Sequence, residues 1–370
     1  MIQLAERDPR VGREKASLDT PALVVDLDAM EGSIARIARA CREHGVSWRP
    51  HTKGQKTPEI VRKEIAAGAI GATCAKLGEA EVMADAGIAD ILIANQIVGP
   101  VKISRLMALR EKADVIVAVD SVANVAELAA AATHSRRKLR VVVEVDIGMK
   151  RAGVLPGAPV LALAEVIARH PALAFTGLMG WESHAVTIAD PAEKERVAAA
   201  AIRLLTESAA VCRANGYPIT IVSCGGGGTF PYCIRQPGVT EVQVGGLIFG
   251  GNYYRSQQHI DFPDAMTVLA TVTSRPTPTR IVIDAGIKAM STDGAPPVPM
   301  GLPEVRSIRV SAEHSTIELR EPSAVPGTGD HLELVVGNSD TTVNLHDELV
   351  AVRQGRIEAV WKIAARGKIR

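Results

Sequence analysis

The feature of this sequence that most constrains its fold is a repeat of short apolar segments and alanine-rich segments over roughly its first two thirds. Eight apolar segments have the length of buried strands, and helical patterns between them stop at signals such as Asn215-Gly216. Continuously apolar strands that alternate with helices form parallel sheets covered on both faces. Eight such units in about 200 residues predict an α/β protein with a (β/α)8 TIM-like barrel, and an open doubly wound sheet is the alternative. The expected strands are 46–50, 70–74, 91–94, 115–119, 139–145, 174–179, 219–223 and 241–244.

The pattern changes after residue 260, where short strand-like segments are joined by proline and glycine turns and helical stretches are absent. This part predicts a C-terminal, mostly antiparallel β domain. Residues 16–26 also look like a strand, and the barrel is complete without them, so we expect them to join the β domain. The predicted domains are a barrel at 27–258 and a β domain made of 1–26 and 259–370. The expected strands are 268–273, 280–284, 305–310, 315–320, 331–336, 347–353 and 356–364.

Composition excludes several classes of partner. A net charge of +1 and 3% aromatic residues give no basis for binding nucleic acid or an anionic membrane. The N-terminus lacks an apolar run, and no later stretch reaches the length of a membrane-spanning helix. The five cysteines are odd in number and form no Cys-x-x-Cys pair, which argues against a structural zinc site or a disulfide framework. We therefore expect a soluble, cytoplasmic protein.

Barrel chemistry resides at the carboxyl ends of the strands, so the residues that follow each strand are the candidates for a site. A lysine, Lys53, follows the first strand, and a run of four glycines ending at Thr229 follows the seventh. Glycine backbone N–H groups can converge on an anion, and a phosphate site after strands seven and eight recurs in barrels. The run is not a Walker loop, because no Lys-Ser/Thr follows it. The alternatives are a solvated lysine and a flexible turn.

A phosphate site and a lysine at one barrel mouth suit pyridoxal 5'-phosphate, an aldehyde that lysine binds covalently. Beyond this pattern, long stretches of the chain resemble the D-threonine aldolase family. That family stands with D-serine dehydratase and 3-hydroxy-D-aspartate aldolase among the alanine-racemase-type (fold type III) pyridoxal phosphate enzymes. The stretches are LDTPALVVDLDAM, RPHTKGQKTPEI, VEVDIGMKRAGV, GGGGT, EVQVGG, DAGIK and DTTVNLHDELVAVRQGRIEAVWKIAARG.

The resemblance implies roles for particular residues. Lys53, in the Arg-Pro-His-x-Lys motif, would bind the cofactor covalently, and Arg151 would face the cofactor ring. A homodimer is implied by analogy, in which the β domain of one subunit meets the barrel of the other. The phosphate would be held by Gly226, Gly227, Gly228, Thr229, Gly245 and Gly246.

The sequence departs from the family at its metal site. Family aldolases carry His-x-Asp and the dehydratases His-x-Cys, whereas this chain has Asn338-Ser339-Asp340. The exchange of an imidazole for an amide disfavours zinc and leaves Mn²⁺ or Mg²⁺ with oxygen ligands as the candidate at Asp340 and Asn338. His346 and Asp347 lie close by in sequence, but the family has similar residues there beside its usual ligands.

Two further departures concern the chemistry. The family's Lys-x-His-Lys is Lys53-Gly54-Gln55-Lys56 here, and its aromatic-His-Gly is Trp181-Glu182-Ser183-His184. Glu182 or His184 would replace the missing histidine as the base, or would have a hydrogen-bonded structural role instead. The function we expect is a lyase that cleaves a small-molecule D-β-hydroxy-α-amino acid by a retro-aldol reaction. The alternatives are a D-amino acid dehydratase, deaminase or racemase, or a non-catalytic cofactor-binding protein.

Overall fold

The structure is a computed structural model that describes residues 8–370 apart from 134, 136 and 303. It divides into two compact units. One comprises the chain up to Ile34 together with Gly246–Arg366, and the other comprises Ala35–Gly245 with Gly367–Arg370. The predicted domain bounds of 27–258, 1–26 and 259–370 stay a prediction. No helix among the described residues is long and apolar enough to span a bilayer.

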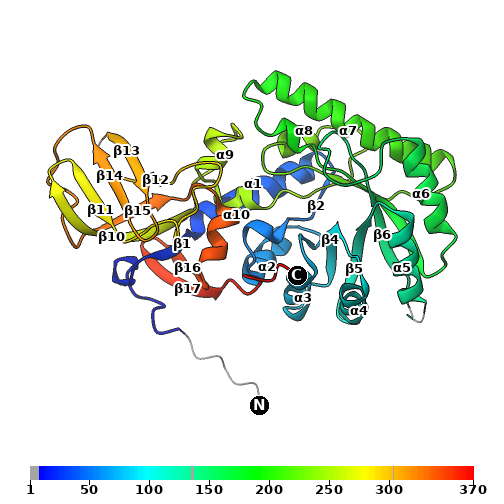
Figure 1. The fold of residues 1–370 in the computed structure, drawn as a ribbon, viewed down its shortest axis with the longest axis horizontal. Helices are drawn as coiled ribbons and strands as arrows, with labels where there is room; N and C mark the ends of the chain where they lie inside the picture. The colour runs from blue at the N-terminus through cyan, green and yellow to red at the C-terminus, as the bar shows by residue number, and fades with distance from the viewer. Residues whose placement is uncertain (1–7, 134, 136, 303) are drawn as a thin grey trace, which may run out of the picture. The chain divides into compact units, whose positions relative to one another are not determined.

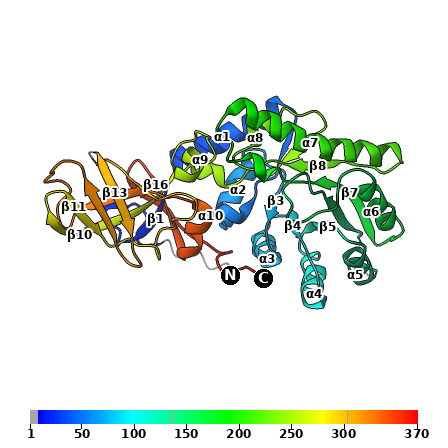
Figure 2. The same ribbon diagram turned by 45° about the horizontal axis from the view of Figure 1, so that its top comes forward.

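The second unit is the predicted barrel. All of its strands are parallel, in the order β2-β9-β8-β7-β6-β5-β4-β3. A parallel bridge between His51 and Thr73 joins the two ends of this sheet, so the sheet closes and the open alternative is ruled out. Each expected strand is present (Figures 1 and 2): β2 (Ser47–Trp48), β3 (Ala72–Cys74), β4 (Asp90–Gln96), β5 (Asp114–Val119), β6 (Leu139–Glu144), β7 (Leu173–Met179), β8 (Ile221–Cys224) and β9 (Glu241–Val242).

Helices connect successive strands, and α3 to α6 line the outside of β3 to β6 in Figure 2. Their ends follow ordinary capping rules: the Asp190 side chain accepts the Glu193 N–H at the start of α7, and Gly216, at φ +84°, follows its end. The helices are α1 (Leu27–Glu43), α2 (Pro58–Ala66), α3 (Leu77–Asp85), α4 (Pro100–Leu109), α5 (Val122–Ala132), α6 (Ala158–Ala168), α7 (Pro191–Ala214) and α8 (Phe230–Cys233).

The interior of the barrel is packed in two layers. Near the amino ends of the strands, buried Arg49 of the loop after β2 contacts Glu241 of β9 at 3.3 Å and Asp90 of β4 at 2.9 Å. An apolar layer lies on the same face of the strands, because alternate residues of a strand share a face. The filled interior leaves the loops at the carboxyl ends for chemistry. The apolar layer comprises Leu92, Ile116, Ala118, Val142, Met179 and Ile221.

The first unit is a nine-stranded sheet in the order β13-β14-β11-β10-β1-β16-β17, with β15 paired to β10 and β12. The N-terminal strand β1 lies between β10 and β16, which confirms that this segment joins the β domain. The expected absence of helix was wrong, because one turn, α10 (Ser339–Thr342), interrupts the strands. The strands are β1 (Ala22–Asp26), β10 (Met266–Thr277), β11 (Arg280–Ile283), β12 (Val298–Pro299), β13 (Val305–Val310), β14 (Ser315–Leu319), β15 (His331–Val335), β16 (Glu348–Arg353) and β17 (Arg356–Lys362).

A buried carboxyl supports the segment that follows β2. Gln55 and Glu64 are both fully buried, and the Gln55 amide donates a 2.7 Å hydrogen bond to the Glu64 carboxyl. Burial raises the pKa of Glu64 to about 8, and the hydrogen bond from Gln55 offsets only part of that shift. Gln55, which replaces a family histidine, therefore serves as the partner of a carboxyl that is protonated at neutral pH.

Glu64 should make stability depend on pH. Because its pKa is higher in the folded chain than the unfolded value of 4.5, the folded state binds the extra proton between these values. The stabilisation that Glu64 gains from this proton is complete below the unfolded pKa and is lost as the pH rises through about 8. The wild-type free energy of unfolding, minus that of Glu64→Gln, should therefore fall by roughly 1.4 kcal/mol per pH unit across this window. Denaturant titrations from pH 5 to 8.5 would measure it, and a constant difference would contradict it.

Candidate functional site

Three of the residues at the carboxyl ends of the barrel strands meet around one indole ring. Trp181 follows β7, and the Lys53 Nζ lies 5.0 Å from the centroid of its ring. The Arg151 guanidinium carbon, after β6, lies 5.4 Å from the same centroid. Cations over an indole are attracted by the negative charge of its faces. The structure thus brings Lys53 and Arg151 together as expected, on a residue that the sequence did not single out as a ligand.

His51 is a second member of this site that the sequence analysis missed. Its Nδ1 accepts the backbone N–H of Lys53 at 3.3 Å. Burial, together with the positive charges of Lys53, Lys56 and Arg151, holds the pKa of His51 well below its usual range. The imidazole is therefore neutral, with its proton on Nε2. The signal was present in the sequence, because His51 is the histidine of the Arg-Pro-His-x-Lys motif.

The glycine run after β8 forms a loop with free donors. The backbone N–H groups of Gly227 and Gly228 donate to no acceptor in the part of the chain that the structure describes. A Cβ at Gly226 would lie 3.0 Å from the Trp181 Nε1, so a side chain there would crowd the indole. That Nε1 is buried and also lacks an acceptor among the described residues. Three N–H donors, two on this loop and one on the neighbouring indole, thus have no acceptor among the described residues.

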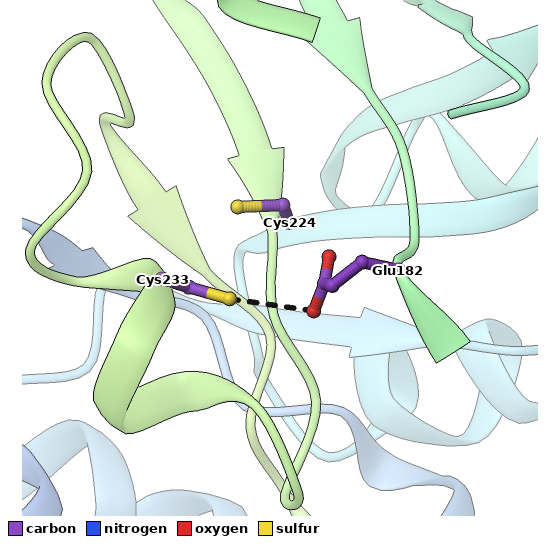
Figure 3. A group of neighbouring side chains, drawn as sticks. All are labelled: Glu182, Cys224 and Cys233. Atoms are coloured by element: carbon purple, nitrogen blue, oxygen red, sulfur yellow. Dashed lines mark hydrogen bonds between the residues drawn. The ribbon is translucent and has the colours of Figure 1, made fainter. Parts of the chain in front are cut away.

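Glu182 supports this loop through several hydrogen bonds, of which Figure 3 draws the one from the Cys233 thiol. Its side chain is fully buried, and its carboxylate accepts the hydroxyl of Thr229, a longer bond from the Gly225 N–H at 3.4 Å, and the Cys233 thiol at 3.3 Å. The Thr229 oxygen in turn accepts the Gly226 N–H at 3.3 Å. The Thr229 hydroxyl therefore donates its hydrogen bond to Glu182 and supports the loop. It was expected from the sequence to donate to the phosphate instead.

His184 lies apart from Glu182 although only one residue separates them. Its imidazole is exposed and packs on Gly148 of the loop after β6, where a Cβ would lie 2.8 Å from its Cε1. Gly148 has φ +121°, and Asp146 fixes this turn by accepting the N–H groups of Gly148 and Lys150. Of the two candidate bases, only His184 thus presents its functional group to solvent.

The two glycines after β9 fall in different units. Gly245 belongs to the barrel, where a Cβ would lie 2.0 Å from the carbonyl oxygen of His51, so the two backbones need glycine to pass. Gly246 belongs to the β unit, where a Cβ would lie 2.7 Å from the Tyr254 hydroxyl and 2.8 Å from an Asp340 oxygen. Burial and the charge of Asp340 raise the pKa of Tyr254 well above its usual range, so its phenol stays protonated.

Of the two predicted metal ligands, the side chain of Asn338 is engaged in local structure, whereas one oxygen of Asp340 is buried without a hydrogen bond among the described residues. The side-chain oxygen of Asn338 caps α10 by accepting the Asp340 N–H at 3.0 Å. The His346 Nε2 lies 2.8 Å from the Ala289 carbonyl oxygen. This donor set, an amide and a carboxylate without an imidazole or a thiolate, does not fit zinc, and for a harder ion it supplies the carboxylate of Asp340. We therefore derive no reaction step through a metal.

The barrel residues, by contrast, fit pyridoxal phosphate. Lys53 supplies an amine for its aldehyde, and the N–H groups of Gly227, Gly228 and Trp181 supply donors for its phosphate. Arg151 lies on the same ring as Lys53 and also contacts Glu144 at 3.7 Å. Unpartnered donors around a glycine loop are the arrangement that an anionic group requires.

Comparisons with known proteins agree with this geometry. A family model described as "Alanine racemase, N-terminal domain" matches residues 25–253, and one described as "Putative serine dehydratase domain" matches 265–352. A D-threonine aldolase from an Arthrobacter species is 34% identical over 359 residues, which cover 96% of this chain and 95% of that protein. A 3-hydroxy-D-aspartate aldolase from Paracoccus denitrificans is 34% identical over 367 residues, with 96% and 94% covered.

A solved structure extends the agreement to the whole fold. The crystal structure of D-threonine aldolase from Filomicrobium marinum superposes with a TM-score of 0.94 at 34% identity, covering 98% of this chain and 99% of that one. The family resemblance seen in the sequence is confirmed. The chain belongs to the D-threonine aldolase and D-serine dehydratase-like family of alanine-racemase-type pyridoxal phosphate enzymes.

Proposed function

We propose that this enzyme cleaves a D-β-hydroxy-α-amino acid into a small amino acid and an aldehyde, with pyridoxal phosphate as its cofactor. The observation that carries the proposal is the convergence of Lys53 and the unpartnered donors of the glycine loop on Trp181. The relatives named as aldolases support the reaction type. A cytoplasmic location and a homodimer stay predictions.

The cofactor would be bound at both of its ends. Lys53 would hold its carbonyl carbon, and the N–H groups of Gly227, Gly228 and Trp181 would hold its phosphate. Gly226 would admit the phosphate close to the backbone, while Gly245 and Gly246 keep the neighbouring backbone compact. When bound, this cofactor supplies a sink for the electron pair released from the bond that breaks.

The chain itself must supply the proton transfers. Cleavage of the Cα–Cβ bond requires a base that takes the proton of the β-hydroxyl, and the released Cα then takes up a proton. We assign the base to His184, because its imidazole is exposed, and a supporting role to Glu182, because its carboxylate is buried and hydrogen-bonded to the loop. The neutral His51 carries a proton on Nε2 and is a donor for the substrate.

Dehydration is the second candidate, because the C-terminal match is to a "Putative serine dehydratase domain". In that reaction the β-hydroxyl leaves, and the products are a 2-oxo acid and ammonia instead of an aldehyde. A leaving hydroxyl is commonly assisted by a metal acting as a Lewis acid. Aldol cleavage is favoured because the relatives that match along nearly their whole length are named as aldolases.

The purified protein should show the absorption band of lysine-bound pyridoxal phosphate, and borohydride should fix the cofactor on the peptide that contains Lys53. D-threonine and D-phenylserine should then release aldehyde, whereas L-threonine should not. A Lys53→Ala variant is the control for both measurements. Formation of a 2-oxo acid without any aldehyde would contradict aldol cleavage and would support dehydration. If aldehyde release requires Mn²⁺ and is lost in the Asp340→Asn variant, Asp340 binds a catalytic metal ion after all.

The indole N–H of Trp181 is expected to donate to the cofactor phosphate. Trp181→Phe keeps an aromatic ring for Lys53 and Arg151 but removes the donor. The loss of one hydrogen bond to a charged group should weaken cofactor binding by about 10- to 100-fold. Titration of the apoprotein with pyridoxal phosphate, followed by absorbance, measures this change, and Trp361→Phe in β17 is the matched control. Equal affinity of Trp181→Phe and the wild type would contradict the assignment.

His184 and Glu182 are expected to fail in different ways. His184→Gln should lower kcat by about 10²- to 10⁴-fold with cofactor binding unchanged, because it removes only a proton acceptor. Glu182→Gln should weaken cofactor retention, because it removes the charge that holds Thr229 and Gly225. Both properties should be unaffected in Ser183→Ala, which lies between them. A Glu182→Gln variant that keeps its cofactor but loses kcat would make Glu182 the base.

A further inference from the structure

One cluster of ligating side chains joins Glu182 to two cysteines that the proposed reaction does not use (Figure 3). Cys224 ends β8, Cys233 ends α8, and Glu182 follows β7. The two sulfur atoms and a carboxylate oxygen all lie within 4.8 Å of one another. All three residues are buried, with exposed fractions of 1%, 0% and 0%. The two cysteines bracket the glycine loop, with the run from Gly225 to Gly228 between them.

We propose that Glu182, Cys224 and Cys233 form a binding site for one zinc-like metal ion. Two thiolates and a carboxylate are ligands that zinc and cadmium accept, and thiolates select against Mg²⁺ and Mn²⁺. Ligand atoms around a tetrahedral zinc ion lie roughly 3.5–3.8 Å apart, given bond lengths of about 2.3 Å to sulfur and 2.1 Å to oxygen. The cluster therefore needs to contract by about 1 Å at most.

Binding of the ion exchanges it for protons. The Cys233 thiol donates to Glu182, and burial above all keeps the pKa of this thiol well above its usual range, so it is protonated without the ion. A metal–sulfur bond forms only when the thiol proton is released. An ion held by both sulfurs therefore displaces about two protons to solvent, and its affinity rises with pH. A free surface carboxylate would release none.

Occupation of this site would disturb the glycine loop. The Glu182 oxygen that accepts the Thr229 hydroxyl is the same one that accepts the Cys233 thiol. An ion bound to this oxygen and to Cys233 competes with Thr229 for it, so the loop loses part of its support. The metal is therefore expected to weaken cofactor retention. This consequence rests on the proposed function, whereas the ion site itself does not.

The test is a titration of the full-length protein with Cd²⁺, with a phosphine to keep the thiols reduced. We expect a thiolate-to-cadmium charge-transfer band that saturates at one ion, about two protons released per ion, and competition by Zn²⁺ but not by Mg²⁺. Cys224→Ser and Cys233→Ser should each weaken binding at least 100-fold, and Glu182→Gln about tenfold. Cys41→Ser and Cys212→Ser, which alter buried cysteines outside the cluster, should bind as the wild type does.

Two outcomes would overturn the proposal. One is the absence of a saturable band in a protein whose circular dichroism is native. The other is an equal band in the Cys224→Ser/Cys233→Ser double variant. X-ray absorption of the cadmium complex gives a second measure that does not depend on how a variant folds, since it should show two sulfur neighbours. A protein that binds Cd²⁺ but shows no cofactor band would refute the proposed function alone, and one with a cofactor band but no Cd²⁺ site would refute this inference alone.

Discussion

The glycine loop of the barrel depends on one buried carboxylate. Four consecutive glycines can bind an anion only if something outside the run fixes their conformation, because glycine has the largest conformational freedom to lose. Glu182 supplies that constraint through Thr229, Gly225 and Cys233. Burial of a carboxylate is unfavourable, and the hydrogen bonds that the loop donates to it offset this desolvation free energy. Glu182 thus fixes the loop that carries the unpartnered N–H groups of Gly227 and Gly228.

Much of this organisation could be predicted from the sequence. Apolar strands alternating with helices predicted a parallel sheet covered on both faces, because such burial leaves a continuous apolar pattern. The choice of a barrel over an open sheet is confirmed by the bridge between His51 and Thr73. The short strand at 22–26 was assigned to the β domain because the eight barrel strands could be counted without it, and its pairing with β10 and β16 confirms that assignment. The one-turn helix α10 was not predicted, since four residues are too few for a helical period to show.

The side-chain arrangement within the site could be predicted only in part. Lys53 and Arg151 were expected at one barrel mouth because parallel strands end at one edge, but the indole between them depends on a side-chain direction that spacing does not specify. The side-chain direction of Glu182 could not be predicted from the sequence either. Glu182 and His184 are two residues apart, yet the side chain of Glu182 is buried and that of His184 is exposed to solvent. The proximity of Cys224 and Cys233 could not be recognised from a Cys-x-x-Cys spacing, because a strand, a loop and a short helix bring these two residues together.

The departures from the family share a physical logic. At two positions where the resemblance implies a histidine, this chain has an uncharged amide with a local structural partner: Gln55 donates to buried Glu64, and Asn338 caps α10. An amide keeps its hydrogen-bonding capacity at every pH, whereas an imidazole changes charge near neutrality. Each amide here therefore supplies a hydrogen bond without adding a group that titrates near neutral pH. Under the proposed function, proton donation and acceptance fall to the histidines by the barrel loops, His51 beside Lys53 and exposed His184 on Gly148.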